Sequence, residues 1–193
     1  GIVKFIDGLD LKGMEKHDHY EIQLKDNKIL RYNDIRKFGS IHWTQDIDNH
    51  FLIKNLGPEP LSEEFNGVFL KNKCRKRNVA IKNLIMNQRI VVGVGNIYAC
   101  ESLYLSSIRP EKKCKYITLK QCNDLAKAIK YVLKKSIKSG GTTLKDFKTL
   151  DGTPGYFKQK LMIYDCKICK CGAKVKNIKL GGRSSFYCNI CQK

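Results

Sequence analysis

The feature that most constrains this chain is a set of five cysteines in its last 28 residues, Cys166 to Lys193. They form two clusters, and the second is a C-x-x-C pair, Cys188 and Cys191. Two cysteine pairs about 15–20 residues apart supply the four thiolates of a tetrahedral structural zinc site. A disulfide framework is the alternative, but the other four cysteines are scattered singly along the chain. We therefore expect one Zn²⁺ ion and a C-terminal zinc-finger β-hairpin.

The first cluster offers three cysteines for two ligand positions: Cys166, Cys169 and Cys171. Cys166 and Cys169 form an ordinary C-x-x-C knuckle, whereas Cys171 precedes a glycine of the kind that relaxes a knuckle turn. The residues by themselves leave open which of the three is spare.

Arg183 stands between the two clusters, directly after Gly181-Gly182. Because two glycines favour a tight turn, we expect Arg183 at the tip of the hairpin, away from the metal. A guanidinium presented in this way suits a phosphate group, which it binds through two parallel N–H bonds. The alternative is an ordinary solvated surface arginine.

The positive charge is concentrated in the last two thirds of the chain. Residues 1–63 hold 9 Lys/Arg against 11 Asp/Glu, a balance of −2, whereas residues 64–193 hold 28 against 7, a balance of +21. This predicts a polyanion partner, and nucleic acid is favoured over a membrane because no basic amphipathic helix carries bulky aromatic residues on its apolar face. No apolar run is long enough to span a bilayer, so we expect a cytoplasmic protein without membrane contact.

The first third of the chain has the pattern of antiparallel strands. An alternating segment at residues 20–24, a turn at Asp26-Asn27 and a return segment at residues 29–32 predict a hairpin, and residues 39–43 fit a further strand. The polar connection before that last strand holds Arg36 and Phe38. A lone aromatic residue is by default a core residue, but beside a cation Phe38 can also wedge into a base stack.

The chain becomes helical after residues 56–61, whose two prolines predict an extended linker. Ser62 is the expected N-cap of a first helix. Apolar periodicity predicts further helices near residues 80–85 and over residues 119–137, and Gly140-Gly141 is expected to end the last one.

Gly93 and Gly95 precede Asn96, which opens another predicted helix. A tight turn of this kind exposes backbone N–H groups at a helix N-terminus, where an anion binds. The alternative is a compact helix–helix turn that serves packing alone. The basic surroundings and the zinc hairpin favour a phosphate site.

The segments that carry these features resemble bacterial formamidopyrimidine-DNA glycosylase. The resemblance implies an α+β fold with the remnant of an N-terminal β-sandwich, a helix-two-turn-helix domain and a zinc-finger hairpin. It implies a monomeric base-excision repair enzyme that excises oxidised purines (8-oxoguanine, formamidopyrimidines) from double-stranded DNA and nicks the abasic site by β,δ-elimination. The segments are residues 16–19, 56–61, 92–99, 140–144, 151–157 and the finger that ends at residues 186–193.

The resemblance also implies domain boundaries and residue roles. Arg183 is implied to grip phosphates at the lesion and to act in the δ-elimination step. The domains are expected at residues 1–55 (partial β-sandwich), 56–61 (linker), 62–150 (helix-two-turn-helix) and 151–193 (end of the lesion loop and zinc finger). The implied metal ligands are Cys166, Cys171, Cys188 and Cys191, with Cys169 as an alternative in the first knuckle. The implied DNA contacts are His17, Arg36, Phe38, Arg77 and Asn96, with Lys145 and Tyr156 in the loop that folds over the flipped base.

The catalytic centre of the family is an N-terminal Pro-Glu pair, and this sequence, which opens at Gly1, shows no counterpart of it. We therefore expect the chain by itself to bind damaged DNA without forming a covalent adduct. Two other functions stay open. One is a non-catalytic nucleic-acid-binding fragment. The other is an endonuclease VIII-like glycosylase for oxidised pyrimidines, which the segment Arg36-Lys37-Phe38 argues against.

Overall fold

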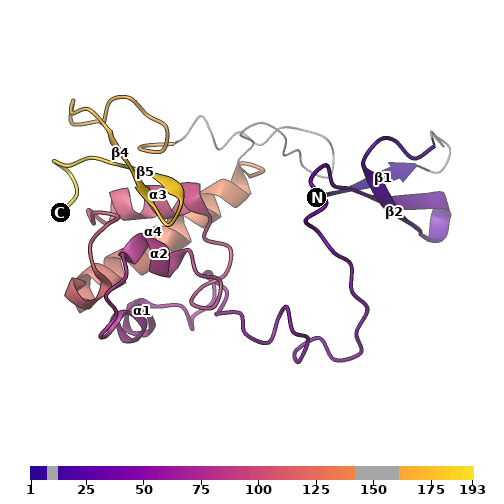
Figure 1. Cartoon of the computed structure of the whole chain (residues 1–193), viewed down its shortest axis with the longest axis horizontal. Helices are drawn as coiled ribbons and strands as arrows, with labels where there is room; N and C mark the ends of the chain where they lie inside the picture. Colours follow the sequence, from indigo (N-terminus) through magenta and orange to yellow (C-terminus); the bar gives the residue numbers. More distant parts are fainter. Residues whose placement is uncertain (8–12, 142–160) are drawn as a thin grey trace. The chain divides into compact units, whose positions relative to one another are not determined.

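The computed structural model describes residues 1–7, 13–141 and 161–193 and combines helices with two antiparallel sheets (Figure 1). The predicted mixture of α and β structure is confirmed. The described residues fall into two compact units, which we treat separately. The first unit holds residues 1–45 and 138–141, and the second holds residues 46–137 and 161–193, with the gaps given above.

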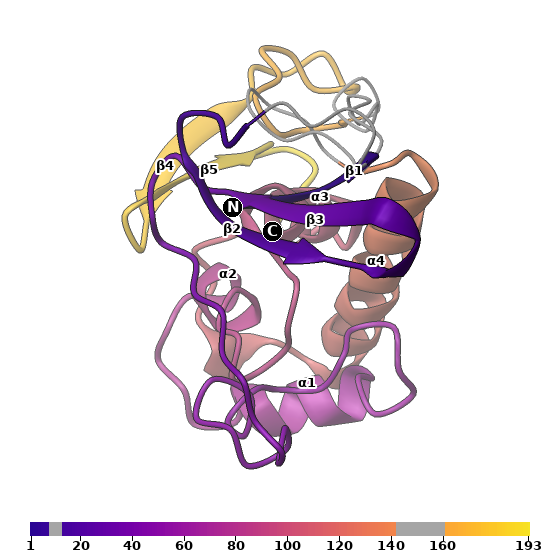
Figure 2. The ribbon, with the colours of Figure 1, turned by 90° about the vertical axis from the view of Figure 1, so that its right-hand side faces the viewer.

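The first unit contains a three-stranded antiparallel sheet of order β1-β3-β2, whose strands lie side by side in Figure 2. Strand β1 spans Ile2–Asp7, β2 spans Asp18–Gln23 and β3 spans Lys28–Asn33. The predicted hairpin is thus confirmed, and a 3-10 turn, η1 (Lys25–Asn27), joins its strands. Asp26 and Asn27 adopt φ values of 67° and 54° there, which short polar residues tolerate best after glycine.

The two faces of this sheet differ in polarity. Paired residues share a face, so the pairing of Phe5 and Ile22 with Leu30 places these three apolar side chains together. On the other face Arg31 is buried and forms ion pairs with Asp18 (3.4 Å) and Glu21. Phe5 and Ile22 remain 53% and 39% exposed, so the described residues of this unit form little apolar core.

The strand expected at residues 39–43 is wrong, because the segment has no strand conformation. Its Gly39 N–H donates to the Asp34 carboxylate instead (2.8 Å), and Trp43 is 92% exposed. The alternation of apolar and polar residues therefore does not correspond to a buried face here.

The second unit contains four α-helices, one 3-10 turn and a β-hairpin in the part of the chain that the structure describes. Its core is formed by buried side chains from all four helices, among them Leu70, Ile85, Leu103 and Ile129. None of the described helices has the length and apolarity needed to cross a bilayer. The elements are α1 (Gly67–Cys74), α2 (Ile81–Ile85), α3 (Asn96–Leu105), η2 (Cys114–Tyr116), α4 (Leu119–Lys138), β4 (Lys176–Leu180) and β5 (Arg183–Tyr187).

The N-termini of α4 and α1 show where the sequence alone identifies the N-cap residue and where it does not. Helix α4 begins as predicted, with the Thr118 hydroxyl accepting from the Gln121 N–H (3.1 Å). Helix α1 begins at Gly67 and not after Ser62, because the Asn66 side chain caps it by accepting from Phe69 N–H (2.9 Å). Ser62 and Asn66 are both suitable N-caps, and the first turn of α1 forms at Asn66.

The segment expected to be a linker, residues 56–61, is packed within the second unit. Gly57 donates its N–H to Gln88 O (2.7 Å), and Val92 donates to Pro58 O (3.3 Å). A Cβ atom on Gly57 would lie 2.4 Å from the Ile90 carbonyl carbon, so only glycine permits this approach. The break between the two compact units lies near residue 45.

Candidate nucleic-acid interface

Strands β4 and β5 form a two-residue hairpin that presents Arg183. Gly181 and Gly182 have φ values of 54° and 76°, as a turn with two left-handed residues requires, and Leu180 pairs with Arg183 directly beyond it. Arg183 is exposed at the start of β5. The expected place of this arginine at the hairpin tip is therefore confirmed.

The hairpin is bound to the N-terminus of α3. The Asn96 side-chain amide donates to Ser184 O at 3.0 Å, so the first residue of the helix holds the residue next to Arg183. On the other side of the turn, a Cβ atom on Gly181 would come within 3.0 Å of Asn83 Oδ1 on α2. Because this neighbour is the end of a flexible side chain, the positive φ of Gly181 is the stronger reason for glycine at this position.

Lys82 is the residue that sequence reasoning missed here. It lies on α2 and is fully buried, and its ammonium donates to Asn96 Oδ1 (2.5 Å), Ser185 Oγ (2.6 Å) and Ser184 O (3.1 Å). Burial lowers the pKa of this ammonium, and the Arg183 guanidinium nearby acts in the same direction. A lysine within a short amphipathic segment gives no sign of burial, so no local pattern could have identified it.

Together these residues form a positively charged site at the start of α3. Gly93 (φ 74°) and Gly95 shape the turn before Asn96, and the first N–H groups of a helix have no intrahelical acceptor. Lys82 and Arg183 add two cations. The arrangement can bind an anion such as a phosphate group.

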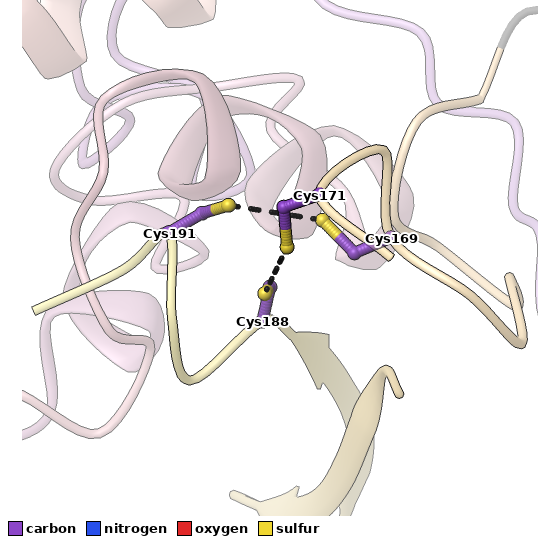
Figure 3. A group of neighbouring side chains, drawn as sticks. All are labelled: Cys169, Cys171, Cys188 and Cys191. Atoms are coloured by element: carbon purple, nitrogen blue, oxygen red, sulfur yellow. Dashed lines mark hydrogen bonds between the residues drawn. The ribbon is translucent and has the colours of Figure 1, made fainter. Parts of the chain in front are cut away.

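Four cysteine sulfurs converge at the other end of the hairpin, as Figure 3 shows. The Sγ atoms of Cys169 and Cys191 lie 3.8 Å apart, those of Cys171 and Cys188 lie 3.6 Å apart, and all four lie within 4.8 Å of one another. A tetrahedral zinc ion with bonds of about 2.3 Å requires S···S distances of about 3.8 Å. The four sulfurs therefore fit a tetrahedral metal ion.

Cys166 is not part of this group, which corrects the expected ligand set. A tight turn places Cys169 and Cys171 together: Gly172 (φ 83°) donates to Cys169 O (2.9 Å), and Cys169 donates to Ala173 O (2.8 Å). Cys166 lies before this turn, with its Sγ 3.8 Å from Tyr164 O. The first pair is thus Cys169 and Cys171, so Cys169 takes the place expected for Cys166, which was the alternative left open in the first knuckle.

The surroundings of Cys169 favour its thiolate form. Burial alone would raise the pKa of this thiol. Hydrogen bonds from the Cys171 backbone N–H and from the Tyr104 hydroxyl, whose oxygen lies 3.2 Å from Cys169 Sγ, outweigh that effect and bring the pKa down to about 6. Hydrogen bonds to Cys171 and burial raise the pKa of Cys191 to about 12. Metal binding at this cluster would consequently release a proton from Cys191.

Two buried polar residues attach the cysteine cluster to α3 and to the segment that follows it, and both were missed in the sequence. Glu101 accepts the backbone N–H groups of Met162, Ile163 and Tyr164 at 2.8–2.9 Å. Gln192 accepts from the Cys188 N–H (2.8 Å) and donates to Ile108 O (2.7 Å). The Glu101 bonds and the Gln192–Ile108 bond connect segments distant in the chain, which is why they leave no local sequence signal.

The other predicted DNA contacts lie in different places. Phe38 is 83% exposed with the Arg36 guanidinium 5.3 Å from its ring centroid, so its default assignment to the core is wrong. His17 (φ 76°) is half-buried in the same unit. Arg77 is exposed in the second unit, beyond the end of α1. The remaining two, Lys145 and Tyr156, fall outside the described residues.

Comparisons with known sequences point to one family. Residues 56–148 match the family model described as the formamidopyrimidine-DNA glycosylase H2TH domain. A formamidopyrimidine-DNA glycosylase from Haemophilus influenzae (strain PittEE) is 50% identical over 183 residues, which is 93% of this chain and 68% of that protein. The protein of the same name from Salmonella arizonae is 48% identical over 184 residues, with the same two coverages.

Solved structures give the same result. The structure of Lactococcus lactis Fpg in complex with DNA containing an abasic site matches 99% of this chain and 71% of its own, with a TM-score of 0.86 and 34% identity. The MutM (Fpg) protein from Thermus thermophilus matches 93% of this chain and 70% of its own, with a TM-score of 0.83 and 30% identity.

Proposed function

Because the chain belongs to the formamidopyrimidine-DNA glycosylase family, we propose that it acts in base-excision repair by binding duplex DNA with an abasic site or an oxidised purine. The observation that carries the proposal is the bonding of the Arg183 hairpin to the N-terminus of α3 through Asn96 and Lys82. A helix N-terminus beside an exposed guanidinium suits successive phosphates of one strand. The protein acts as a monomer in this proposal.

In this proposal Cys169, Cys171, Cys188 and Cys191 hold a Zn²⁺ ion. The S···S distances of 3.6 and 3.8 Å support zinc, and four thiolates leave no open position for catalysis. The ion supplies a structural cross-link when bound. The chain's own contribution is the attachment of the cluster to α3 through Glu101 and to Ile108, beyond the end of α3, through Gln192.

The DNA contacts are proposed from both units. Arg77 and Asn96 bind phosphates together with Arg183, while Arg36 and Phe38 enter the gap that the flipped base leaves. The exposure of Phe38 and the cation beside it support that role. His17, Lys145 and Tyr156 remain predictions that rest on the resemblance.

The chemical step is proposed to need the Pro-Glu segment that the resemblance implies. A covalent imine requires an amine that is unprotonated near neutral pH, and an α-amino group with a pKa of about 7.7–8.0 meets this better than a lysine at about 10.4. Arg183 would then assist δ-elimination. The fine specificity proposed is for 8-oxoguanine and formamidopyrimidines.

The salt dependence of DNA binding tests the proposal. Each phosphate contact contributes a slope of about 0.9 to the plot of log K against log salt concentration. Arg183→Ala should weaken binding to abasic-site DNA and reduce the slope by about 0.9, because one phosphate contact is lost. Lys120→Ala is the matched control, since it removes a cation that is paired with Asp124 at 3.2 Å on α4. Equal slopes for wild type and Arg183→Ala would contradict the proposed role.

Borohydride trapping separates binding from catalysis. The 193-residue chain should bind abasic-site DNA and give no trapped adduct or nicked product. The same chain fused behind an N-terminal segment that begins with the Pro-Glu pair should give both. A trapped adduct from the 193-residue chain alone would show that its nucleophile lies within this sequence.

A further inference from the structure

Two basic runs that lie far apart in the sequence come together in the helical unit. Residues 73–77 hold four cations and residues 112–115 hold three, and neither run contains an acidic residue. The two residues that are not cations, Cys74 and Cys114, are fully buried in the core. Each run is therefore attached to the core through its cysteine, and its exposed members are all charged.

Backbone hydrogen bonds hold the two runs side by side. Lys115 donates its N–H to Arg77 O (3.0 Å), and an antiparallel bridge joins Ala80 to Lys113. Residues that lie opposite each other in an antiparallel pair have Cα atoms about 4.5–5.5 Å apart. Cations from both runs therefore share one surface, which the sequence does not show because the runs are more than 30 positions apart.

The cations of this surface are not neutralised by the protein. Within residues 1–7, 13–141 and 161–193, none of its five exposed cations forms an ion pair with an acidic side chain. The acidic residue directly before the second run, Glu111, is instead 3.9 Å from the Arg109 guanidinium. Like charges held together in this way favour a polyanion partner. We call these five residues the basic surface: Arg75, Lys76, Arg77, Lys113 and Lys115.

Lys82 connects the basic surface to the positively charged site at the start of α3. Its backbone N–H donates to Pro110 O (3.2 Å), just before the second basic run, and its ammonium donates to Asn96 Oδ1 beside the Arg183 hairpin. A single side chain thus joins the two places. Since each DNA strand carries one phosphate per about 3.4 Å of helix axis, a duplex bound at Arg183 reaches the basic surface within a few nucleotides.

An exposed tyrosine beside the surface favours nucleic acid over an acidic protein as the partner. Tyr116 is 63% exposed, and the Lys115 ammonium lies 5.0 Å from its ring centroid. Tyrosine hydroxyls, like lysine and arginine side chains, donate to phosphate oxygens at DNA interfaces. The connection through Lys82 to a site that suits phosphate points to the same partner.

We propose that the basic surface binds the phosphate backbone of the duplex on one side of the lesion. This inference rests on the proposed function, because DNA held at Arg183 determines which part of the duplex lies over the surface. Contacts to phosphates carry no sequence information, so the surface raises affinity without changing the preference for a lesion. Each contact releases counterions and adds about 0.9 to the slope of log K against log salt concentration.

Duplex length tests the proposal. Binding of the 193-residue chain is measured over a range of salt concentrations with two abasic-site duplexes, which extend about 5 or about 15 base pairs to each side of the lesion. The triple variant Arg75→Ala/Lys113→Ala/Lys115→Ala should lower the slope on the long duplex by up to about 2.7 and leave the slope on the short duplex nearly unchanged. All three side chains are exposed, so their replacement should change stability little.

A second triple variant controls for the loss of net charge. Lys120→Ala/Lys127→Ala/Lys134→Ala removes the same number of cations from the exposed side of α4, and it should change the slope much less on the long duplex. Two further duplexes, with the long flank on only the 5′ or only the 3′ side of the lesion, give a sharper pattern. The effect of the first triple variant should appear with one of these duplexes and be absent with the other.

The contrary results are specific. A wild-type slope for the first triple variant on the long duplex, or an equal decrease in the control, would leave the basic surface as ordinary solvated lysines and arginines. An equal decrease on short and long duplexes, or with both one-sided duplexes, would exclude binding to one flank. An unchanged DNA slope with lost binding to polyglutamate would assign the surface to an acidic protein instead. Arg183→Ala should weaken binding to short and long duplexes alike, so failure of the proposed function gives a different result.

Discussion

Replacing Lys82 with methionine tests whether a buried ammonium holds the hairpin to the helices. Methionine has a similar length and no donor, so the change removes three hydrogen bonds with little change in volume. Ser184 O keeps the bond from Asn96 Nδ2 (3.0 Å), and Ser185 Oγ can still donate to Arg183 O (3.2 Å). The main loss is the donor to Asn96 Oδ1.

The expected destabilisation of Lys82→Met follows from the number of acceptors that lose their donor. A buried acceptor left unsatisfied costs about 1–3 kcal/mol, and relief of the buried charge offsets part of this cost. We expect a net destabilisation of about 1–2 kcal/mol, because the three acceptors are neutral and two of them keep a partner. For a chain of this length that corresponds to a decrease in Tm of about 2–8 °C.

Thermal denaturation, metal content and DNA affinity are the three measurements. Lys82→Met should bind zinc like the wild type but bind abasic-site DNA more weakly, since the Arg183 hairpin loses its two bonds from Lys82 and keeps only the Asn96 bond to Ser184 O. Lys120→Met is the control, because this lysine is 88% exposed and its replacement should change stability by less than about 0.5 kcal/mol. If Lys82→Met were as stable as the wild type and bound DNA equally well, the proposed fixing of the hairpin would be wrong.

Two further predictions concern the metal cluster and the N-terminal sheet. Metal analysis should find one zinc ion per chain in the wild type and in Cys166→Ser, and none in Cys169→Ser; the reverse pattern would restore the ligand set expected from the resemblance. Hydrogen bonds from the Gly39 N–H and the Tyr32 hydroxyl hold the pKa of Asp34 at about 2, against 3.8 in an unfolded chain. The ionised Asp34 carboxylate therefore stabilises the fold above pH 3.8, and this stabilisation is lost as the pH falls towards 2. Hydrogen exchange in β3 should therefore show Asp34→Asn to be less protected than wild type at neutral pH, with the difference disappearing at low pH. A difference that does not depend on pH would exclude the carboxylate as its cause.

Elements whose signals are local were predictable from the sequence. Two consecutive glycines determine the β4–β5 turn and hence the exposed place of Arg183, because only residues that tolerate positive φ close such a hairpin. Thr118 and the glycine pair at residues 140–141 mark the ends of α4 for the same kind of reason. In each case the interaction joins residues within a few positions of one another.

Competing local signals were not resolved by the sequence. Ser62 and Asn66 are both acceptable caps, and the tertiary structure selects Asn66. The three cysteines at residues 166–171 are chemically equivalent as ligands, and the choice depends on where the turn at Gly172 places their sulfurs relative to Cys188 and Cys191. The position of each sulfur relative to Cys188 and Cys191 decides which cysteines are ligands, and packing sets that position.

The sequence by itself determined the cysteine-rich hairpin, the basic helical region and the place of Arg183, because spacing, charge and turn residues act over short stretches of chain. Only the tertiary structure decided the roles of Lys82, Glu101 and Gln192. Each is a polar side chain that looks solvent-exposed in the sequence, and each is buried with at least one hydrogen-bond partner 62 or more positions away. Burying a polar group is favourable only when its hydrogen bonds are satisfied, and those partners come within reach only once the chain has folded.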